Sequence, residues 1–229
     1  MTNWLRRGPR GPWVALSIPI LAVALSATVE DVKAPRLKGA GALPRAAQLA
    51  VGGGEVALEL FVGNDGAVAK VEVLTSTPPF TDAVTAAVRG WQFDPAQDTI
   101  DKQLVAVPGR VLVLAAFRPP AVYASPAPGG PTQVLGRPSA ALPQPGALTM
   151  PPYPPKVFGD GTVLVEIEMS AAGAPREYRI LGSKSGFDAA ALEAVRSWRF
   201  GAPSLSRVPD PIYVYAIVSF REPVVTGHD

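Results

Sequence analysis

The feature that most constrains the fold is an internal repeat. The stretch AAVRGWQF at residues 86–93 returns as EAVRSWRF at residues 193–200, so that two of the four tryptophans stand 107 positions apart in the same setting. At this offset residues 54–93 and 161–200 align without a gap, and glycines, aromatic residues and an arginine match in register. Repeated spacing of this kind indicates a duplicated structural unit. The chain is therefore expected to fold as two copies of one small unit.

Each copy begins with the pattern of a β-hairpin. Apolar residues alternate with other residues over positions 56–62 and 163–169, and a period of two is typical of a half-buried strand. Gly66 and Gly173 then stand where a chain reversal needs a residue that tolerates positive φ. The return strand follows directly, over residues 68–74 in the first copy.

The period then changes to that of a helix. From Phe80 to Trp91, and again from Phe187 to Trp198, apolar residues recur at spacings of three and four, which gives one apolar stripe that must face the hairpin. Alanines within the stripe allow the helix to lie close to the sheet, while the aromatic residues at its two ends fill the core. Phe80, Phe187, Trp91 and Trp198 are therefore the predicted core residues.

A third strand closes each copy. Alternating apolar residues indicate it over residues 110–117 in the first copy and 212–220 in the second. Each copy thus has the order ββαβ, and the predicted fold class is α+β. We expect two tandem domains, each a three-stranded antiparallel sheet with one helix, after an N-terminal apolar helix. A three-stranded sheet leaves edges unpaired.

Composition narrows the possible functions. The chain has no cysteine, and its single histidine, His228, is the second-last residue, so catalytic triads, Cys-ligated zinc and histidine metal sites are not expected. The formal net charge is +2, and three arginines lie in the first ten residues, so the rest of the chain is close to neutral. It lacks the clustered basic residues that nucleic-acid binding requires. We expect neither an enzyme nor a nucleic-acid-binding protein, and no metal or cofactor.

The N-terminal segment, residues 1–29, is predicted to direct export. Arg6, Arg7 and Arg10 precede an uncharged run over residues 13–29, and acidic residues follow directly. This order keeps the N-terminus in the cytoplasm and exports the rest of the chain. As a helix the run spans about 26 Å, slightly less than a hydrocarbon core of about 30 Å. A cleaved signal peptide and a retained membrane anchor both remain open.

Proline-rich sequence separates the two copies. Residues 119–155 contain twelve prolines and few charges, which favours extended polyproline geometry, and we expect this segment to be a spacer. The predicted boundaries are 1–29 for the signal peptide or anchor, 30–50 for a first linker, 51–118 for domain 1, 119–152 for the proline-rich linker, 153–222 for domain 2 and 223–229 for a tail.

These patterns resemble the TonB C-terminal domain family. The second copy contains the family's Tyr153-Pro154 shortly before a Gly-x-Val strand, its Val-Arg-x-Trp-x-Phe helix ending at residues 195–200, and the following Pro203. The first copy keeps the core of the pattern but lacks the tyrosine. The resemblance covers roughly 60% of the chain.

The resemblance implies a function as an energy transducer. Proteins of this family carry force from the ExbB and ExbD proton channel of the inner membrane, through a proline-rich linker, to outer-membrane receptors. Their C-terminal domain holds a short receptor peptide, the TonB box, as an added strand beside the last strand of its sheet. On this sequence the implied peptide-binding residues are Ile212, Tyr213, Val214, Tyr215, Ala216, Ile217, Val218, Ser219 and Phe220. The implied location is the periplasm, with the N-terminal helix in the inner membrane or cleaved after export.

One departure from the family concerns the motor. Family anchors pair a serine with a histidine four residues later for coupling to ExbB and ExbD, whereas here Ser17 is followed at that spacing by Leu21. A second interpretation therefore stays open, in which the protein is a non-energised periplasmic scaffold. Its two domains would then pair with each other through their third strands, which would hide both strand edges.

Two polar motifs have a simpler structural interpretation. Glu166 and Glu168 lie two residues apart on one strand face, and we expect a solvated face balanced by Arg176 or Arg179 rather than a pair for acid–base catalysis. The glycine- and serine-rich stretch at residues 182–186 lacks the spacing of a phosphate loop, and we expect a strand-to-helix turn there.

Other side chains near the core are expected to have structural roles as well. Arg89 and Arg196, beside the tryptophans, are expected to extend over the sheet edge. For Tyr213 and Tyr215 two interpretations remain open, namely ordinary aromatic residues on the sheet surface and contacts with a bound peptide.

Overall fold

The computed structural model describes residues 32–44, 52–119, 132–150 and 152–223. It is α+β, as predicted, with many strands and two helices. The predicted N-terminal apolar helix lies outside the described residues. Within the described part of the chain, no helix is long and apolar enough to span a membrane.

Both repeats contain the predicted hairpin, helix and closing strand, in this order. In the first repeat these are β2 (Gly54–Val62), β3 (Val68–Ser76), α1 (Phe80–Val88) and β7 (Gly109–Phe117). In the second they are β10 (Gly161–Met169), β11 (Pro175–Gly182), α2 (Asp188–Ser197) and β13 (Ile212–Phe220). Gly66 and Gly173 have φ of 80° and 76°, so each hairpin turns where the sequence placed a glycine.

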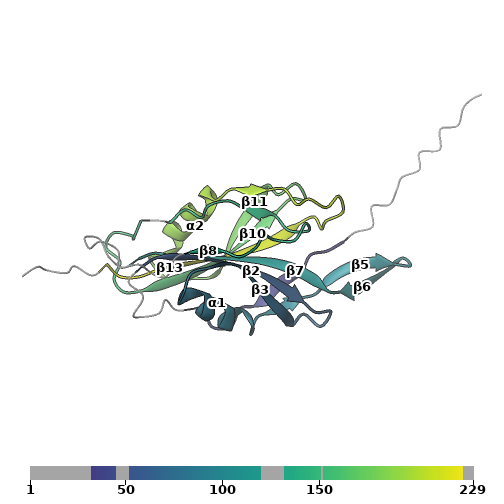
Figure 1. The fold of residues 1–229 in the computed structure, drawn as a ribbon, viewed down its shortest axis with the longest axis horizontal. Coiled ribbons are helices and arrows are strands. Elements are labelled where there is room, and N and C mark those ends of the chain that lie inside the picture. Colours follow the sequence, from purple (N-terminus) through teal and green to yellow (C-terminus); the bar gives the residue numbers. More distant parts are fainter. Residues whose placement is uncertain (1–31, 45–51, 120–131, 151, 224–229) are drawn as a thin grey trace, which may run out of the picture.

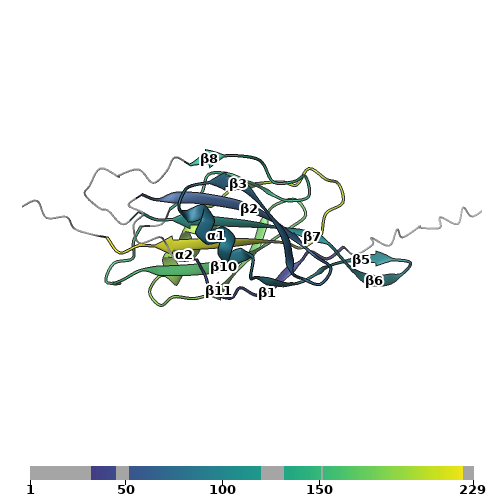
Figure 2. The ribbon, with the colours of Figure 1, turned by 60° about the horizontal axis from the view of Figure 1, so that its bottom comes forward.

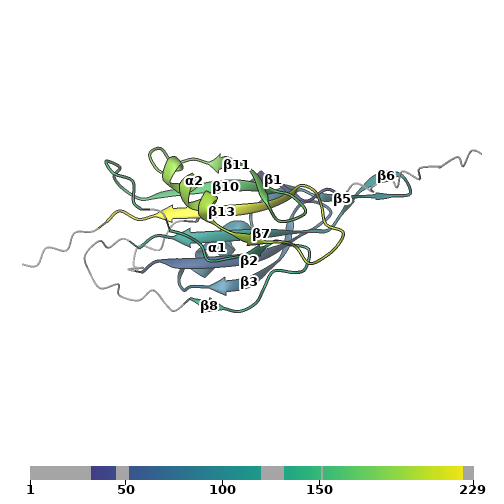
Figure 3. The same cartoon turned by 90° about the horizontal axis from the view of Figure 1, so that it is seen from above.

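The two repeats share one sheet, which corrects the prediction of two separate three-stranded sheets. Its strand order is β11-β10-β13-β7-β2-β3-β8, where β8 (Gln133–Val134) is a short added strand (Figure 3). The two closing strands, β7 and β13, are neighbours at its centre and run parallel. The domains therefore merge through the strands that were expected to be their exposed edges.

The two helices cover opposite faces of this sheet (Figure 1). The order of strands in one repeat mirrors that in the other, and the central pair is parallel. A two-fold axis that runs along the strands relates such an arrangement, and rotation about it exchanges the two faces of the sheet. Each repeat consequently has one face covered by its own helix and one helix-free face.

Two hydrophobic clusters lie on the two faces. The cluster under α1 contains Phe80 and Trp91, which are 1% and 0% exposed. The cluster under α2 contains Phe187 and Trp198, which are 0% and 2% exposed. Both clusters cross the boundary between the repeats, since the first also includes Leu164, Tyr215 and Ile217 of the second repeat.

Two segments, which we call straps, cover the helix-free faces. The N-terminal strap, residues 32–44, contains β1 (Arg36–Gly39), which pairs with β4 (Gln92–Asp94). The inter-repeat strap, residues 132–150, contains β8, which pairs with β3 at the side of the sheet. It also contains β9 (Gln144–Pro145), which pairs with β12 (Phe200–Gly201). A further hairpin, β5 (Ala96–Ile100) and β6 (Gln103–Val107), projects from one end of the molecule (Figure 2).

The inter-repeat strap corrects the prediction of an extended spacer. Its Leu142 is 2% exposed, and the backbone N–H groups of Leu135 and Gly136 donate to the carbonyl oxygen of Leu74 at 2.8 and 3.1 Å. Prolines prevent this segment from forming a sheet of its own, but they do not prevent it from packing against one that already exists. The described part of the proline-rich segment is thus integrated into the fold.

Candidate peptide-binding site

The predicted peptide-binding residues, Ile212 to Phe220, form strand β13. One edge of β13 pairs with β10 along its whole length, from Gly161 opposite Phe220 to Met169 opposite Ile212. The other edge pairs with β7 over six residues, from Val214 opposite Leu112 to Ser219 opposite Phe117. The unpaired edge expected for this strand is therefore not present, because β7 of the same chain occupies it.

The central strands pair because both of their faces are apolar. On β7, Leu112, Leu114 and Ala116 face the cluster under α2, while the residues between them face the cluster under α1. All are at most 1% exposed. If β7 were at an edge of a separate domain, one of these faces would meet water. Parallel strands are typically buried on both faces in this way, and burial of that apolar area favours the merged sheet.

Tyr215 is a core residue, although the sequence was also compatible with a contact between Tyr215 and a bound peptide. It is 0% exposed, and its ring packs edge-on against Trp91 of the first repeat with centroids 6.0 Å apart. Its hydroxyl accepts the backbone N–H of Leu37 at 2.7 Å and donates to Glu166 at 3.2 Å. Burial raises the pKa of Tyr215, so the hydroxyl remains a donor at all ordinary pH values.

Tyr213 is partly buried and lies at the end of β13, beneath the N-terminal strap. The guanidinium of Arg36 lies 4.7 Å from the centre of its ring, a cation–π contact. Both tyrosines of this strand therefore contact the chain's own strap.

Glu166 is buried, which corrects the prediction of a solvated face. Only 2% of its side chain is exposed, and it accepts hydrogen bonds from Arg36 at 3.0 Å and from Arg179 at 2.8 Å. The predicted partnership with Arg179 is confirmed, whereas Arg176 pairs with Asp210 instead. The sequence could not show that the N-terminal strap covers this face of the sheet.

Glu59 is the equivalent residue of the first repeat and is buried in the same way. Its carboxylate accepts hydrogen bonds from Arg110 and from the backbone N–H of Ser139, the latter at 2.9 Å. Ser139 belongs to the inter-repeat strap. Each repeat thus uses one buried glutamate, at the same position of its first strand, to hold the strap that covers its helix-free face.

Comparison with known protein families agrees with this architecture. The family described as "Gram-negative bacterial TonB protein C-terminal" matches residues 41–111 and 158–221, which together make up more than half of the chain. The chain belongs to the TonB C-terminal domain family. No match is found among curated proteins or among solved structures. The TonB family comprises non-enzymatic transducers of the Gram-negative cell envelope, and this chain carries two of its domains.

The remaining polar motifs of the TonB repeats are structural. Residues 182–186 connect β11 to α2, as predicted, with Gly182 as the last residue of the strand. The carboxylate of Asp188 accepts hydrogen bonds from the hydroxyl of Ser183 and the N–H of Lys184. The guanidinium of Arg196 lies 5.8 Å from the ring centre of Tyr178 on the outer strand β11, which confirms that it extends over the sheet edge. In the described ranges no group of His, Cys, Asp and Glu residues is arranged to hold a metal ion.

The sheet ends in β11 on one side and in β8 on the other. β8 pairs with β3 only at Thr75 and Ser76. Among the described residues, the sheet thus has an outer edge on β11 and along most of β3, and neither is β13, the strand to which the TonB family resemblance assigned the peptide.

We expect Glu166→Ala to lower the free energy of unfolding by about 2–3 kcal/mol, because it leaves the buried hydroxyl of Tyr215 and two guanidinium groups without their acceptor. Glu166→Gln should lower it by less, since the amide oxygen still accepts one of these hydrogen bonds. Urea unfolding followed by tryptophan fluorescence measures both.

Glu168→Ala is the matched control, because Glu168 lies on the same strand face but is only partly buried. It should change the unfolding free energy by less than about 0.5 kcal/mol. Equal effects at positions 166 and 168 would contradict the structural role given to Glu166.

Proposed function

We propose that this protein is a TonB-like energy transducer of the cell envelope, which binds a peptide of an outer-membrane TonB-dependent receptor and so supports transport across that membrane. Its membership of the TonB C-terminal family, over both repeats, is the observation that carries this proposal. The proposed location is the periplasm, with residues 1–29 as the inner-membrane anchor or as a cleaved signal. ExbB and ExbD remain proposed partners.

In this proposal the receptor peptide adds to β13, through residues Ile212–Phe220, in place of β7. The β7 strand itself supports the idea, because it demonstrates that this edge of β13 accepts a second strand with regular main-chain hydrogen bonds. Removal of β7 would uncover apolar side chains on both faces of β13. A peptide that replaces it must therefore supply apolar residues at successive positions.

A second candidate function is a periplasmic scaffold whose two domains stay paired. The β7–β13 ladder favours it directly, since this is the pairing that such a scaffold requires. The two hydrophobic clusters that cross the boundary between the repeats support it further. In this case β13 never binds a peptide, and the protein holds other envelope components together.

Titration of the isotope-labelled chain without residues 1–29 with a synthetic TonB-box peptide distinguishes the two functions. If the peptide replaces β7, amide signals of both β7 and β13 should shift together, and the amides of β7 should begin to exchange with solvent. If the protein is a scaffold, amides of both strands should exchange slowly and stay unchanged. A peptide of the same length with proline at alternate positions is the control, because it lacks N–H groups that strand addition needs.

A further inference from the structure

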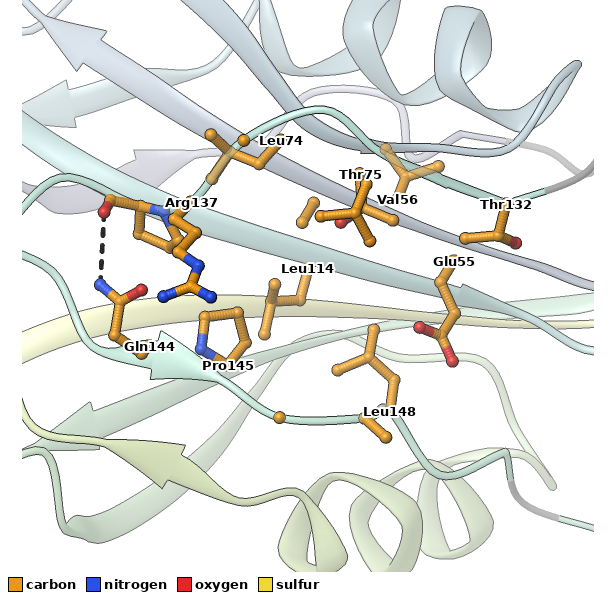
Figure 4. Close-up of a pocket in the computed structure, with 16 residues that line it drawn as sticks. Glu55, Val56, Leu74, Thr75, Leu114, Thr132, Arg137, Gln144, Pro145 and Leu148 are labelled. Carbon is orange, nitrogen blue, oxygen red and sulfur yellow. Dashed lines mark hydrogen bonds between the residues drawn. The ribbon is translucent and has the colours of Figure 1, made fainter.

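A pocket of about 490 Å³ lies between the helix-free face of the first repeat and the inter-repeat strap. Its floor consists of apolar side chains from β2, β3 and β7, among them Ala57, Leu74 and Leu114, each at most 6% exposed. Leu148 and Pro145 of the strap form the opposite wall (Figure 4). This volume and mainly apolar lining are typical of small-molecule sites.

The second repeat shows what the equivalent surface looks like when it is filled. Where β2 has Ala57, which lines the pocket, β10 has the larger Leu164, and Leu114 of β7 corresponds to Ile217 of β13. Leu43 of the N-terminal strap also packs closely on this surface, since a Cβ atom added to Gly182 would lie 2.8 Å from its Cδ1 atom. The position equivalent to Gly182 is Thr75, which lines the pocket.

The pocket therefore results from a difference between two otherwise matching repeats. The smaller side chain of Ala57, where the second repeat has Leu164, leaves space between the sheet and the inter-repeat strap. Apolar surface that is buried but not packed against other atoms destabilises a fold. Binding of a ligand that fills this space is therefore favoured.

Charged groups define the two ends of the pocket. Arg137 extends from the strap towards the apolar floor, and Glu55 lies at the opposite end (Figure 4). No described residue forms an ion pair or hydrogen bond with the guanidinium of Arg137. Burial raises the pKa of Glu55, because removal from water disfavours its charged form. The end formed by Arg137 thus favours an anion, and the end formed by Glu55 disfavours one.

We propose that this pocket binds a small anionic amphiphile, with its carboxylate or phosphate on Arg137 and its apolar body over Ala57, Leu74 and Leu114. An acyl chain with a single acidic head has this chemistry. The binding site belongs to the first repeat and the inter-repeat strap, and it is independent of the peptide proposed for β13.

Decanoate and 8-anilinonaphthalene-1-sulfonate are suitable probes for the exported protein. The fluorescent sulfonate should bind saturably, and decanoate should displace it and shift the methyl signals of Leu74, Leu114 and Leu148. Decyl phosphate should compete as decanoate does, which tests whether the head group is interchangeable. Decanedioate should compete more weakly, since its second carboxylate would lie near Glu55, and decyltrimethylammonium should not compete.

Two variants test the assignment, and the charge variant has a matched control. Ala57→Leu places in the pocket the residue that the second repeat already has at the equivalent position, so the fold should persist while probe binding falls at least tenfold. Arg137→Gln should lower the affinity for the anionic probes roughly tenfold, as expected for loss of a charged hydrogen bond. Arg89→Gln removes the same charge beyond the end of α1, where it is exposed, and should leave binding unchanged.

The proposal is overturned if the anionic probes do not bind saturably, if the shifted methyl signals lie outside the pocket, or if Ala57→Leu binds as the unchanged protein does. Absence of binding would mean that the protein's own residues fill the space.

Discussion

Replacement of Trp91 by alanine is expected to lower the free energy of unfolding by about 3–5 kcal/mol and to destabilise both repeats together. Trp91 is 0% exposed and packs against Phe93 of its own repeat and Tyr215 of the other. Its loss leaves a cavity in a cluster to which both repeats contribute. Two independent domains would instead lose stability in the first repeat alone.

The measurement uses the chain without residues 1–29, and in its Trp91→Ala variant Trp198 is the sole tryptophan. Its fluorescence reports unfolding of the second repeat, and its urea midpoint should fall in Trp91→Ala. Arg89→Ala, at an exposed position beside the same helix, should shift the midpoint little. An unchanged Trp198 transition in Trp91→Ala would show that the two repeats unfold independently.

The second large effect is expected at the junction between the repeats. Ala216 lies on β13 between Leu114 of β7 and Val165 of β10, and it is 0% exposed. Ala216→Asp would place a carboxylate among apolar side chains without a partner, which costs about 4 kcal/mol or more. We expect the variant to be largely unfolded or insoluble at neutral pH.

Thermal unfolding followed by circular dichroism measures the effect of this substitution. Ala189→Asp is the matched control, because it adds the same side chain at an exposed position in the first turn of α2, where a negative charge is tolerated. A normally folded Ala216→Asp protein would contradict the buried parallel junction.

Local structure could be predicted from the sequence because it depends on short-range periodicity. The hairpin glycines and the helical stripes from Phe80 and Phe187 lie where the patterns indicated. The four aromatic residues of these stripes are buried. Each of these features is set by residues close together in the chain.

Long-range pairing was missed, although one signal for it was present. Alternation of Val111, Val113 and Ala115 indicated a strand with one buried face, but Leu112 and Leu114 between them are apolar too. An uninterrupted apolar strand is typical of the centre of a sheet rather than its edge. The register between β7 and β13 depends on residues about 100 positions apart, which no local pattern records.

The buried glutamates were missed for a related reason. Glu59 and Glu166 alternate with apolar residues as surface residues do, and only the straps make them buried. The contact between Ser139 and Glu59 spans 80 residues, and that between Arg36 and Glu166 spans 130. Proline-rich composition gave no indication that these segments pack on the sheet.

The central parallel pair also determines how the molecule responds to tension. Lys33 bridges Gln97 of β5 at one end of the long axis, and β13 runs out towards the other end (Figure 3). A pull between these ends acts along β13, so its ladders to β10 and β7 are loaded in shear and must yield together. Strands pulled apart from one end would instead open bond by bond, at much lower load. The merged sheet is therefore built to stay closed while the chain is stretched.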